Sequence, residues 1–260
     1  MRSIAYLSQC IALKGDDAGD EGTYPFIAER YLEAARPGTR VTTQVIYYSY
    51  PYLDLEQKFE FAARGQPDVI VIEIQASPVA FRAGTPLDLR RFPSAIRTAH
   101  QRFRYLRDLR AHLQLPPGVS QLVHLVDVNF RAAVDGPLRR LVRRLPAPTV
   151  PEYASMVETT LARLAATTTA TIVLAGPAGF TDSGPGNSYV DGAAKAYDSV
   201  NDMVKRIASR HAMAFVDRVA VAVGGGAAFF RPGSSIYYSA GGHRTMGRFV
   251  GETLLRDGVL

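Results

Sequence analysis

Short apolar segments alternate with segments of helical periodicity along this chain, and the alternation constrains its fold more than any other feature. The apolar segments are rich in branched residues and are each followed by turn or polar residues; they span residues 3–7, 40–47, 69–74, 171–175 and 214–216. Apolar residues recur at helical spacing over residues 24–35, 54–64, 197–211 and 243–255. The pattern predicts a three-layer α/β/α sandwich with a five-stranded parallel sheet in flavodoxin-like order.

One long interval interrupts the alternation. About ninety residues separate the third apolar segment from the fourth, whereas a crossover between parallel strands needs only about a dozen. Arg-rich helical patterns occupy residues 94–113 and 137–145, and residues 151–166 have the pattern of the crossover helix itself. We therefore predict a single domain over residues 1–260, with an Arg-rich helical insertion at residues 81–168.

Composition limits the class of protein. With 260 residues, of which 47% are hydrophobic, the chain can bury a substantial core. Its single cysteine, Cys10, excludes an intramolecular disulfide and a cysteine-based metal cluster, which favours a cytoplasmic protein. The first residues lack a signal-peptide pattern, and no apolar run reaches the roughly 18 residues typical of a membrane span. We predict a soluble protein that does not interact with membranes.

The net charge of +6 is unevenly distributed. Between Arg90 and Arg144 there are twelve arginines and three aspartates, so the rest of the chain is slightly acidic. This segment could be a solvated helical face whose Arg stems cover apolar surface. It lacks the aromatic or glycine interleaving of a nucleic-acid module, so nucleic acid is not favoured as a partner. It could also attract an acidic acyl carrier protein or the phosphates of coenzyme A.

Cys10 and His243 are the candidate catalytic pair. Cys10 follows the first predicted strand, where parallel sheets place their ligands, and His243 stands at the start of the last predicted helix. A thiol has an ordinary pKa of about 8.5 and becomes a reactive thiolate beside a histidine or a helix N-terminus. The alternatives are a cysteine that is a small buried hydrophobic residue and a histidine that packs or caps the last helix.

The order of these segments resembles the SGNH, or GDSL-like, hydrolase family. Ser8-Gln9-Cys10-Ile11-Ala12 falls on the block that carries the family's nucleophile, with Cys10 at the nucleophile position. Pro67-Asp68 leads the third strand as in the family, and His243 with Gly247 matches the terminal histidine block. The resemblance covers the predicted sheet but not the insertion, and it implies hydrolysis or transfer of acyl groups.

The chain also departs from the family pattern. Gln75-Ala76-Ser77-Pro78 stands where the family has Gly-x-Asn-Asp, so Ser77 or Gln75 would replace the asparagine that stabilises the oxyanion. The acid expected three residues before the histidine is Ala240. Because a thiol ionises more readily than a hydroxyl, the loss of that acid costs a cysteine enzyme less, and the two replacements together suit a Cys–His dyad.

The remaining candidates concern the pocket and its ligands. Tyr47, Tyr48, Tyr50 and Tyr52 cluster after the second strand, where they form either a pocket wall or ordinary packing. We assign Gln9, Gln75, Ser77, Tyr48 and Tyr50 to oxyanion or substrate binding. The acidic run at residues 16–21 and the histidines of the insertion lack metal-ligand spacing, so we assign no metal and no cofactor.

Together these features predict an acyl-transfer enzyme, either an esterase or thioesterase or an acyltransferase. Cys10 would attack an ester or thioester to form an acyl-enzyme, with His243 as general base and acid. The sequence leaves open whether water or another acceptor receives the acyl group. The alternative is a catalytically inactive binding protein that holds an acidic partner or ligand through the basic insertion.

Overall fold

A parallel five-stranded sheet in the order β2-β1-β3-β4-β5 forms the centre of the computed structural model. The structure describes residues 1–8, 22–48, 55–76, 79, 149–179, 193–231 and 238–260. The strands are β1 Arg2–Ser8, β2 Val41–Tyr47, β3 Val69–Glu73, β4 Thr171–Ala175 and β5 Ala214–Val216. The predicted α/β class, the parallel sheet and the flavodoxin-like order are therefore confirmed.

Helices connect these strands and cover both faces of the sheet. They are α1 Tyr24–Ala35, α2 Leu55–Arg64, α6 Val150–Ala165, α7 Ala193–Arg210, α8 Arg218–Gly225 and α9 Ala240–Arg256, with a short 3₁₀ helix, η4, at Ala227–Phe229. No helix among the described residues is long and apolar enough to cross a membrane. The described residues belong to the compact unit Met1–Phe81 with Pro148–Leu260. The Arg-rich part of the insertion lies outside them, so the predicted domain boundaries stay a prediction.

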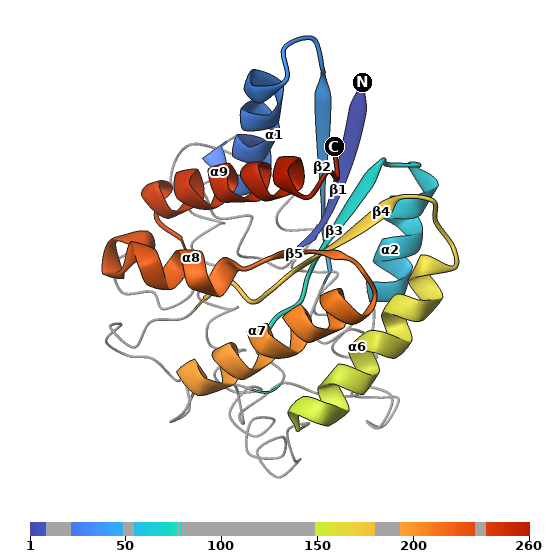
Figure 1. Cartoon of the computed structure of the whole chain (residues 1–260), viewed down its shortest axis with the longest axis vertical. Coiled ribbons are helices and arrows are strands. Elements are labelled where there is room, and N and C mark those ends of the chain that lie inside the picture. Colours follow the sequence, from blue (N-terminus) through green and yellow to red (C-terminus); the bar gives the residue numbers. More distant parts are fainter. Residues whose placement is uncertain (9–21, 49–54, 77–78, 80–148, 180–192, 232–237) are drawn as a thin grey trace, which may run out of the picture. The chain divides into compact units, whose positions relative to one another are not determined.

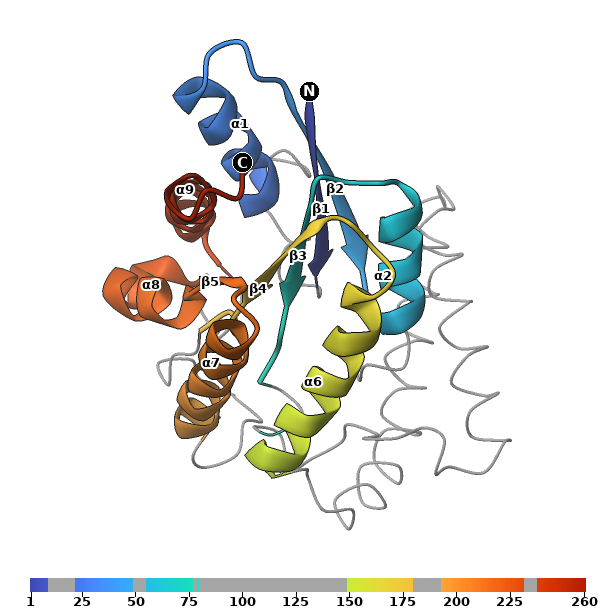
Figure 2. The same ribbon diagram turned by 45° about the vertical axis from the view of Figure 1, so that its right-hand side comes forward.

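The period of two along each strand divides the core into two apolar layers. In β1, Ala5 and Leu7 face the layer that packs under α2, α6 and α7, whereas Ile4 and Tyr6 face the layer under α1, α8 and α9. The views in Figure 1 and Figure 2 agree with this division, with α1 and α9 side by side on one side of the sheet and α2 and α6 on the other. Residues buried on both faces explain why the strands read as continuous apolar runs.

Several of these helices have a side-chain cap at their N-terminus. The crossover helix α6 begins with a capping box, in which the Thr149 hydroxyl accepts from the Glu152 amide while the Glu152 carboxylate accepts from the Thr149 amide. Helix α8 was not predicted, although Asp217 caps it by accepting a hydrogen bond from the Ala220 amide at 3.0 Å. An Asp immediately after an apolar strand is the signal that could have located this helix.

Helices α1 and α9 approach each other closely at Gly247. A Cβ atom at this position would lie 2.6 Å from Cβ of Ile27 and 2.8 Å from the carbonyl oxygen of Tyr24. The backbone contact cannot be relieved by a side-chain rotation, so a larger residue must push the helices apart. Gly247 is thus required for the packing that holds the second turn of α9 against the first turn of α1.

We expect Gly247→Ala to lower the free energy of unfolding by about 1–3 kcal/mol, because the added methyl group overpacks the α1–α9 contact. Urea unfolding followed by far-UV circular dichroism measures this change.

The matched control is Gly241→Ala in the same helix, where an added Cβ atom meets nothing closer than 3.5 Å. This variant should be as stable as the parent or more stable by up to about 1 kcal/mol, because alanine favours a helix over glycine. Equal changes in stability in the two variants would show that close packing does not explain Gly247.

Asp68 fastens the start of β3 to the start of β1. Its carboxylate accepts hydrogen bonds from the Arg2 guanidinium at 2.8 Å and from the Ser3 amide at 2.8 Å. The bond from the Arg2 side chain, followed by that from the Ser3 backbone, lowers the pKa of Asp68 below its ordinary value. The Pro-Asp pair that leads the third strand therefore has a structural function in this chain.

Because the pKa of Asp68 is lower in the folded state, its contribution to stability is present above its ordinary pKa of about 4 and is lost as the pH falls through the lower folded value. We expect Asp68→Asn to destabilise the protein at pH 7 by at most about 1 kcal/mol, because the ion pair is partly exposed. Urea unfolding from pH 7 down to about pH 2 should show the two proteins converging. A difference that stays constant over this range would contradict the assignment.

Candidate active site

The carboxyl ends of the strands bring several polar groups together inside the protein. Ser8, Tyr48, Glu73, Gln75 and Arg218 all lie at or just beyond a strand end and are all buried. Ser8 continues the alternation of Ile4 and Tyr6 and so faces the layer under α1 and α9, and Glu73 continues that of Val69 and Val71 toward the same layer. This edge is where open α/β sheets bind their ligands.

Glu73 and Arg218 form an ion pair within the core. The Arg218 Nη1 atom lies 3.0 Å from Oε2 of Glu73, and both side chains are 0% exposed. Arg218 also donates from Nε to the Gly176 carbonyl at 2.6 Å and from Nη1 to the Tyr24 hydroxyl at 3.4 Å. The pair thereby connects the ends of β3 and β4 with the first turns of α8 and α1.

Burial and this ion pair together set the charge states nearby. Burial alone would lower the pKa of Arg218, but the Glu73 carboxylate together with the neighbouring Tyr238 and Tyr48 holds that pKa above its ordinary value. Burial, reinforced by Glu73, raises the pKa of Tyr6, and burial also raises the pKa of Tyr238. The hydroxyls of Tyr6 and Tyr238 are therefore neutral at every physiological pH.

His243 lies in the first turn of α9, enclosed by aromatic rings. Its ring stacks on Tyr24, with ring centroids 6.3 Å apart and an angle of 12° between the planes, and meets the Tyr238 ring edge to face at 5.5 Å. The side chain is fully buried. Ser239 caps the helix by accepting a hydrogen bond from the Gly242 amide at 3.0 Å, so the position of His243 is fixed by the start of the helix.

A main-chain donor approaches His243 from α1. The Tyr24 amide donates to Nδ1 of His243, with a nitrogen–nitrogen distance of 3.3 Å. A nitrogen that accepts this hydrogen bond carries no proton, so the neutral ring carries its proton on Nε2. In a Ser-His-Asp triad the carboxylate accepts a hydrogen bond from Nδ1–H, which leaves the unprotonated Nε2 free to act as base. Here Nδ1 of His243 accepts a hydrogen bond instead of donating one.

The structure describes only some of the predicted site residues. Cys10, Gln9, Ser77 and Tyr50 lie outside the described residues, and their roles stay predictions. Tyr48 is 2% exposed and packs in the core, where its hydroxyl donates to the Glu73 carbonyl. Ordinary packing, the alternative that the sequence left open, therefore describes Tyr48.

Gln75 is also buried, and its side chain is directed to another acceptor. Its side-chain Nε2 donates to Oε2 of Glu73 at 3.3 Å, and its main-chain carbonyl oxygen accepts from the Tyr153 hydroxyl at 2.8 Å. The predicted oxyanion donor thus binds a carboxylate in this structure. Stabilisation of an oxyanion by Gln75 remains a prediction that requires this amide to exchange partners.

Sequence reasoning missed four residues of this cluster: Glu73, Arg218, Tyr24 and Tyr238. Glu73 had a visible signal, because it is a single carboxylate in the apolar run Val69-Ile70-Val71-Ile72-Glu73-Ile74. A buried acid requires a partner, but nothing in the sequence identifies Arg218 as that partner.

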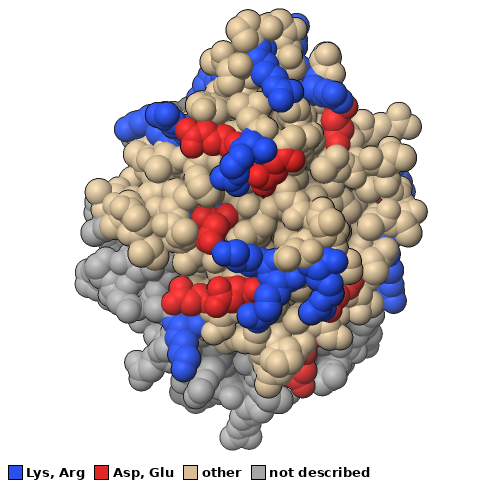
Figure 3. Space-filling model, viewed as in Figure 1, with Lys and Arg blue, Asp and Glu red and all other residues tan. Residues whose placement is uncertain are grey.

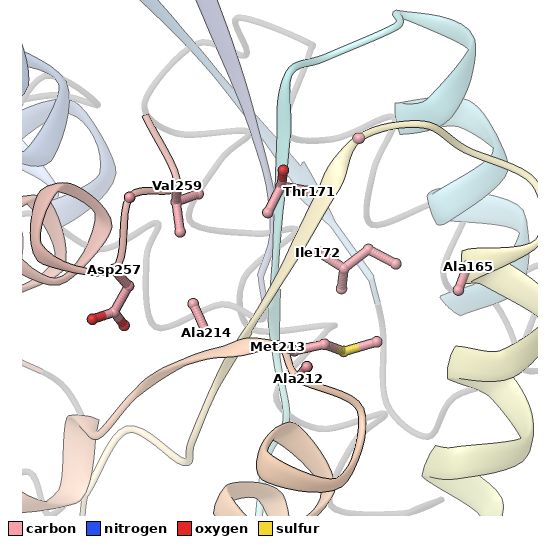
Figure 4. Close-up of a pocket in the computed structure, with 10 residues that line it drawn as sticks. Ala165, Thr171, Ile172, Ala212, Met213, Ala214, Asp257 and Val259 are labelled. Atoms are coloured by element: carbon pink, nitrogen blue, oxygen red, sulfur yellow. The ribbon is translucent and has the colours of Figure 1, made fainter.

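Two hollows among the described residues lie at the opposite end of the strands. Figure 4 shows the first, about 320 Å³, which is lined by residues at the starts of β4 and β5, such as Thr171 and Ala214, and by the C-terminal Val259. The second is lined by Arg2, Asp68 and Thr171, also at strand starts. Neither hollow contains a residue of the polar cluster. Most residues of the segments that follow β1, β2, β3 and β4 at the carboxyl edge, namely 9–21, 49–54, 77–78, 80–148 and 180–192, lie outside the described residues.

Charges of both signs mix on the described surface. Figure 3 shows Lys and Arg side chains beside Asp and Glu side chains rather than a field of one sign. Arg248 pairs with Glu252 at 2.8 Å, and Arg210 pairs with Glu158. The predicted basic surface belongs to residues 90–144, which lie outside the described residues.

The comparisons with known proteins define the class of fold. No protein-family model and no curated protein matches the sequence. A lipase/acylhydrolase from Enterococcus faecalis superimposes with a TM-score of 0.59 at 13% identity, over 99% of this chain and 96% of that chain. A catalytic mutant of Axe2, an acetylxylan esterase from Geobacillus stearothermophilus, gives 0.55 at 16% identity over 98% and 93%. A protein described as a GDSL-like lipase from Parabacteroides merdae gives 0.57 at 12% identity over 100% and 96%. The chain therefore has the fold of the GDSL-type esterases and lipases, as the sequence resemblance predicted.

We expect Arg218→Met to lower the free energy of unfolding by about 3–5 kcal/mol, because it leaves the Glu73 carboxylate buried without its counter-charge. Urea unfolding at pH 7 measures the loss. The double variant Glu73→Leu/Arg218→Met should lose about 1–3 kcal/mol less than the sum of the losses of the two single variants. This difference is the coupling energy of a contacting pair.

The control is Arg210→Met, which breaks the exposed pair with Glu158 and should cost less than about 1 kcal/mol. Additive losses in the double variant would show that Glu73 and Arg218 do not depend on each other.

Proposed function

We propose that this protein is an acyl-transfer enzyme in which Cys10 attacks an ester or thioester and carries the acyl group as a thioester. His243 is its partner in the site. The fold shared with lipases and esterases supports this class of reaction, and the order of residues around Cys10 and His243 supports the assignment of the pair.

The observation that carries the proposal is a series of contacts from the end of β1 to His243. Tyr6 meets the Tyr24 ring edge to face, with centroids 6.1 Å apart, and Tyr24 in turn stacks on His243. Tyr6 is two residues before Ser8, the last residue of β1, and Cys10 follows two residues later. His243 thus lies at the end and on the face of the sheet where the chain leads into the predicted nucleophile segment.

The electrostatics of this edge suit a thiolate and an oxyanion. Helices α1 and α9 both begin at the contact between Tyr24 and His243, so the positive ends of two helix dipoles meet there. The nearest buried charges, on Glu73 and Arg218, compensate each other. Main-chain amides at helix N-termini therefore provide the positive potential that stabilises negative charge in the site.

The reaction has two steps. The Cys10 thiolate attacks the acyl carbon, a carbon–sulfur bond forms, and the alkoxide or thiolate of the donor departs with the electron pair of the bond that breaks. In the second step an acceptor attacks the enzyme thioester, loses its proton and releases the Cys10 thiolate. Water as acceptor gives hydrolysis, and an amine or alcohol gives transfer.

The predicted partners follow from this reaction and from the basic insertion. An acyl group on coenzyme A or on an acidic carrier protein combines a thioester with phosphate or carboxylate groups, which the arginines of residues 90–144 would attract. In the competing proposal, the protein is catalytically inactive and the basic insertion holds an acidic partner or ligand.

Acyl-enzyme formation tests the proposal. The protein is incubated with a panel of acyl thioesters and analysed by intact mass. We expect a mass increase of one acyl group that hydroxylamine removes and that is absent in Cys10→Ala. Because Cys10 is the only cysteine of the chain, a hydroxylamine-sensitive thioester reports on this residue alone.

An adduct that persists in Cys10→Ala, or no adduct with any donor, would favour a binding protein over an enzyme. Circular dichroism of Cys10→Ala provides the control, because an unfolded variant would also lose the adduct.

A further inference from the structure

The hydrogen bond between the Tyr24 amide and Nδ1 of His243 has a chemical consequence for the proposed reaction. An amide N–H cannot accept a proton, so this bond exists only while Nδ1 is deprotonated. A doubly protonated ring would place two N–H groups against each other at this contact. The Tyr24 amide therefore selects the neutral tautomer with its proton on Nε2.

Two further features of the site favour the neutral ring. His243 lies in the first turn of α9 and against the first turn of α1, where the helix dipoles disfavour a cation. The ring is also fully buried between Tyr24 and Tyr238, and burial disfavours the charged form of an imidazole. A carboxylate three residues before the histidine would reverse the preference, but Ala240 occupies that position.

We infer that His243 is held as the Nε2–H tautomer by the Tyr24 main chain and serves as a hydrogen-bond donor, and that the site therefore acts on thioesters in preference to alkyl oxygen esters. This inference rests on the proposed function. It revises the predicted role of general base, because a nitrogen that already carries a proton cannot remove one from the thiol.

The proton balance of the reaction explains the substrate preference. With His243 as donor, the Cys10 proton passes to solvent before attack, and the Nε2–H group stabilises negative charge on sulfur or on the oxyanion. No proton is transferred to the leaving group. A thiolate, with a conjugate-acid pKa of about 8.5, departs without one, whereas an alkoxide, which is far more basic, does not.

Nuclear magnetic resonance tests the tautomer independently of activity. The full-length protein is labelled with ¹⁵N-histidine, and the His243 signals are assigned by their loss in His243→Gln. Two-bond couplings to the ring protons identify each nitrogen. We expect a protonated Nε2 and an unprotonated Nδ1 at neutral pH. A proton on Nδ1, alone or together with Nε2, would overturn the inference.

The dependence of acylation on the leaving group tests the chemistry in the unmodified protein. A series of esters and thioesters with one acyl group and leaving groups of increasing basicity is reacted with the protein, and acyl-enzyme formation is timed by intact mass. We expect the rate to fall as steeply with leaving-group basicity as it does for the thiolate of N-acetylcysteine in water. A markedly shallower slope, with alkyl esters accepted, would show that His243 donates a proton to the leaving group.

Two substitutions separate a donor from a base. Glutamine places an N–H group near the position of Nε2 but cannot take a proton, so His243→Gln should acylate from a thioester within about tenfold of the parent rate, whereas His243→Ala should lose about 100-fold. If His243 were the base, both variants would lose about 10²- to 10⁴-fold. Circular dichroism confirms that each variant is folded.

The outcomes distinguish the inference from the proposed function. Absence of any Cys10 adduct ends the proposed function whatever the tautomer is. An adduct together with a proton on Nδ1, or with equal losses in both folded variants, leaves the acyl-transfer proposal intact and overturns the inference.

Discussion

A carboxylate and a guanidinium that are both withdrawn from water must remain together, and this constraint fixes the carboxyl edge of the sheet. Arg218 is held by Glu73 and by the Gly176 carbonyl and reaches the Tyr24 hydroxyl. Tyr24 in turn places its ring and its amide on His243. The charge pair in the core and His243 are therefore parts of one connected structure, in which Tyr24 is the common member.

The periodicity of the sequence predicted the sheet and most helices because burial on both faces of a parallel strand leaves a direct record in the residues. The start of α8 at Arg218 was missed because its eight residues are too few for a clear period. Cys10 and His243 were assigned from their places in the sequence and a family resemblance, and their roles stay predictions. The pairing of Glu73 with Arg218 was not predictable, because it depends on which strand ends become neighbours in the fold. The sequence around either residue contains no pattern that identifies the other as its partner.

The positive potential at the site comes from the backbone more than from side chains. Glu73 and Arg218 balance each other, and Tyr6 and Tyr238 beside them are neutral. The dipoles of α1 and α9 remain as fixed partial charges at their N-termini, and these charges cost no reorganisation when negative charge develops nearby. An edge of this kind favours an anionic nucleophile and an oxyanion while it disfavours an imidazolium cation.

These electrostatic preferences make two departures from the GDSL pattern consistent with each other: Cys10 at the nucleophile position and Ala240 in the place of the acid. A serine enzyme needs a carboxylate on Nδ1 so that Nε2 can act as base, because a serine hydroxyl does not ionise by itself. Here Ala240 stands in the place of that carboxylate, and the Tyr24 amide donates to Nδ1 instead. Such a ring cannot activate serine, but it can stabilise a thiolate that ionises without its help. In the proposed site, with Ala240 in the place of the family's acid and Nδ1 of His243 accepting a hydrogen bond, cysteine is the nucleophile that His243 can support.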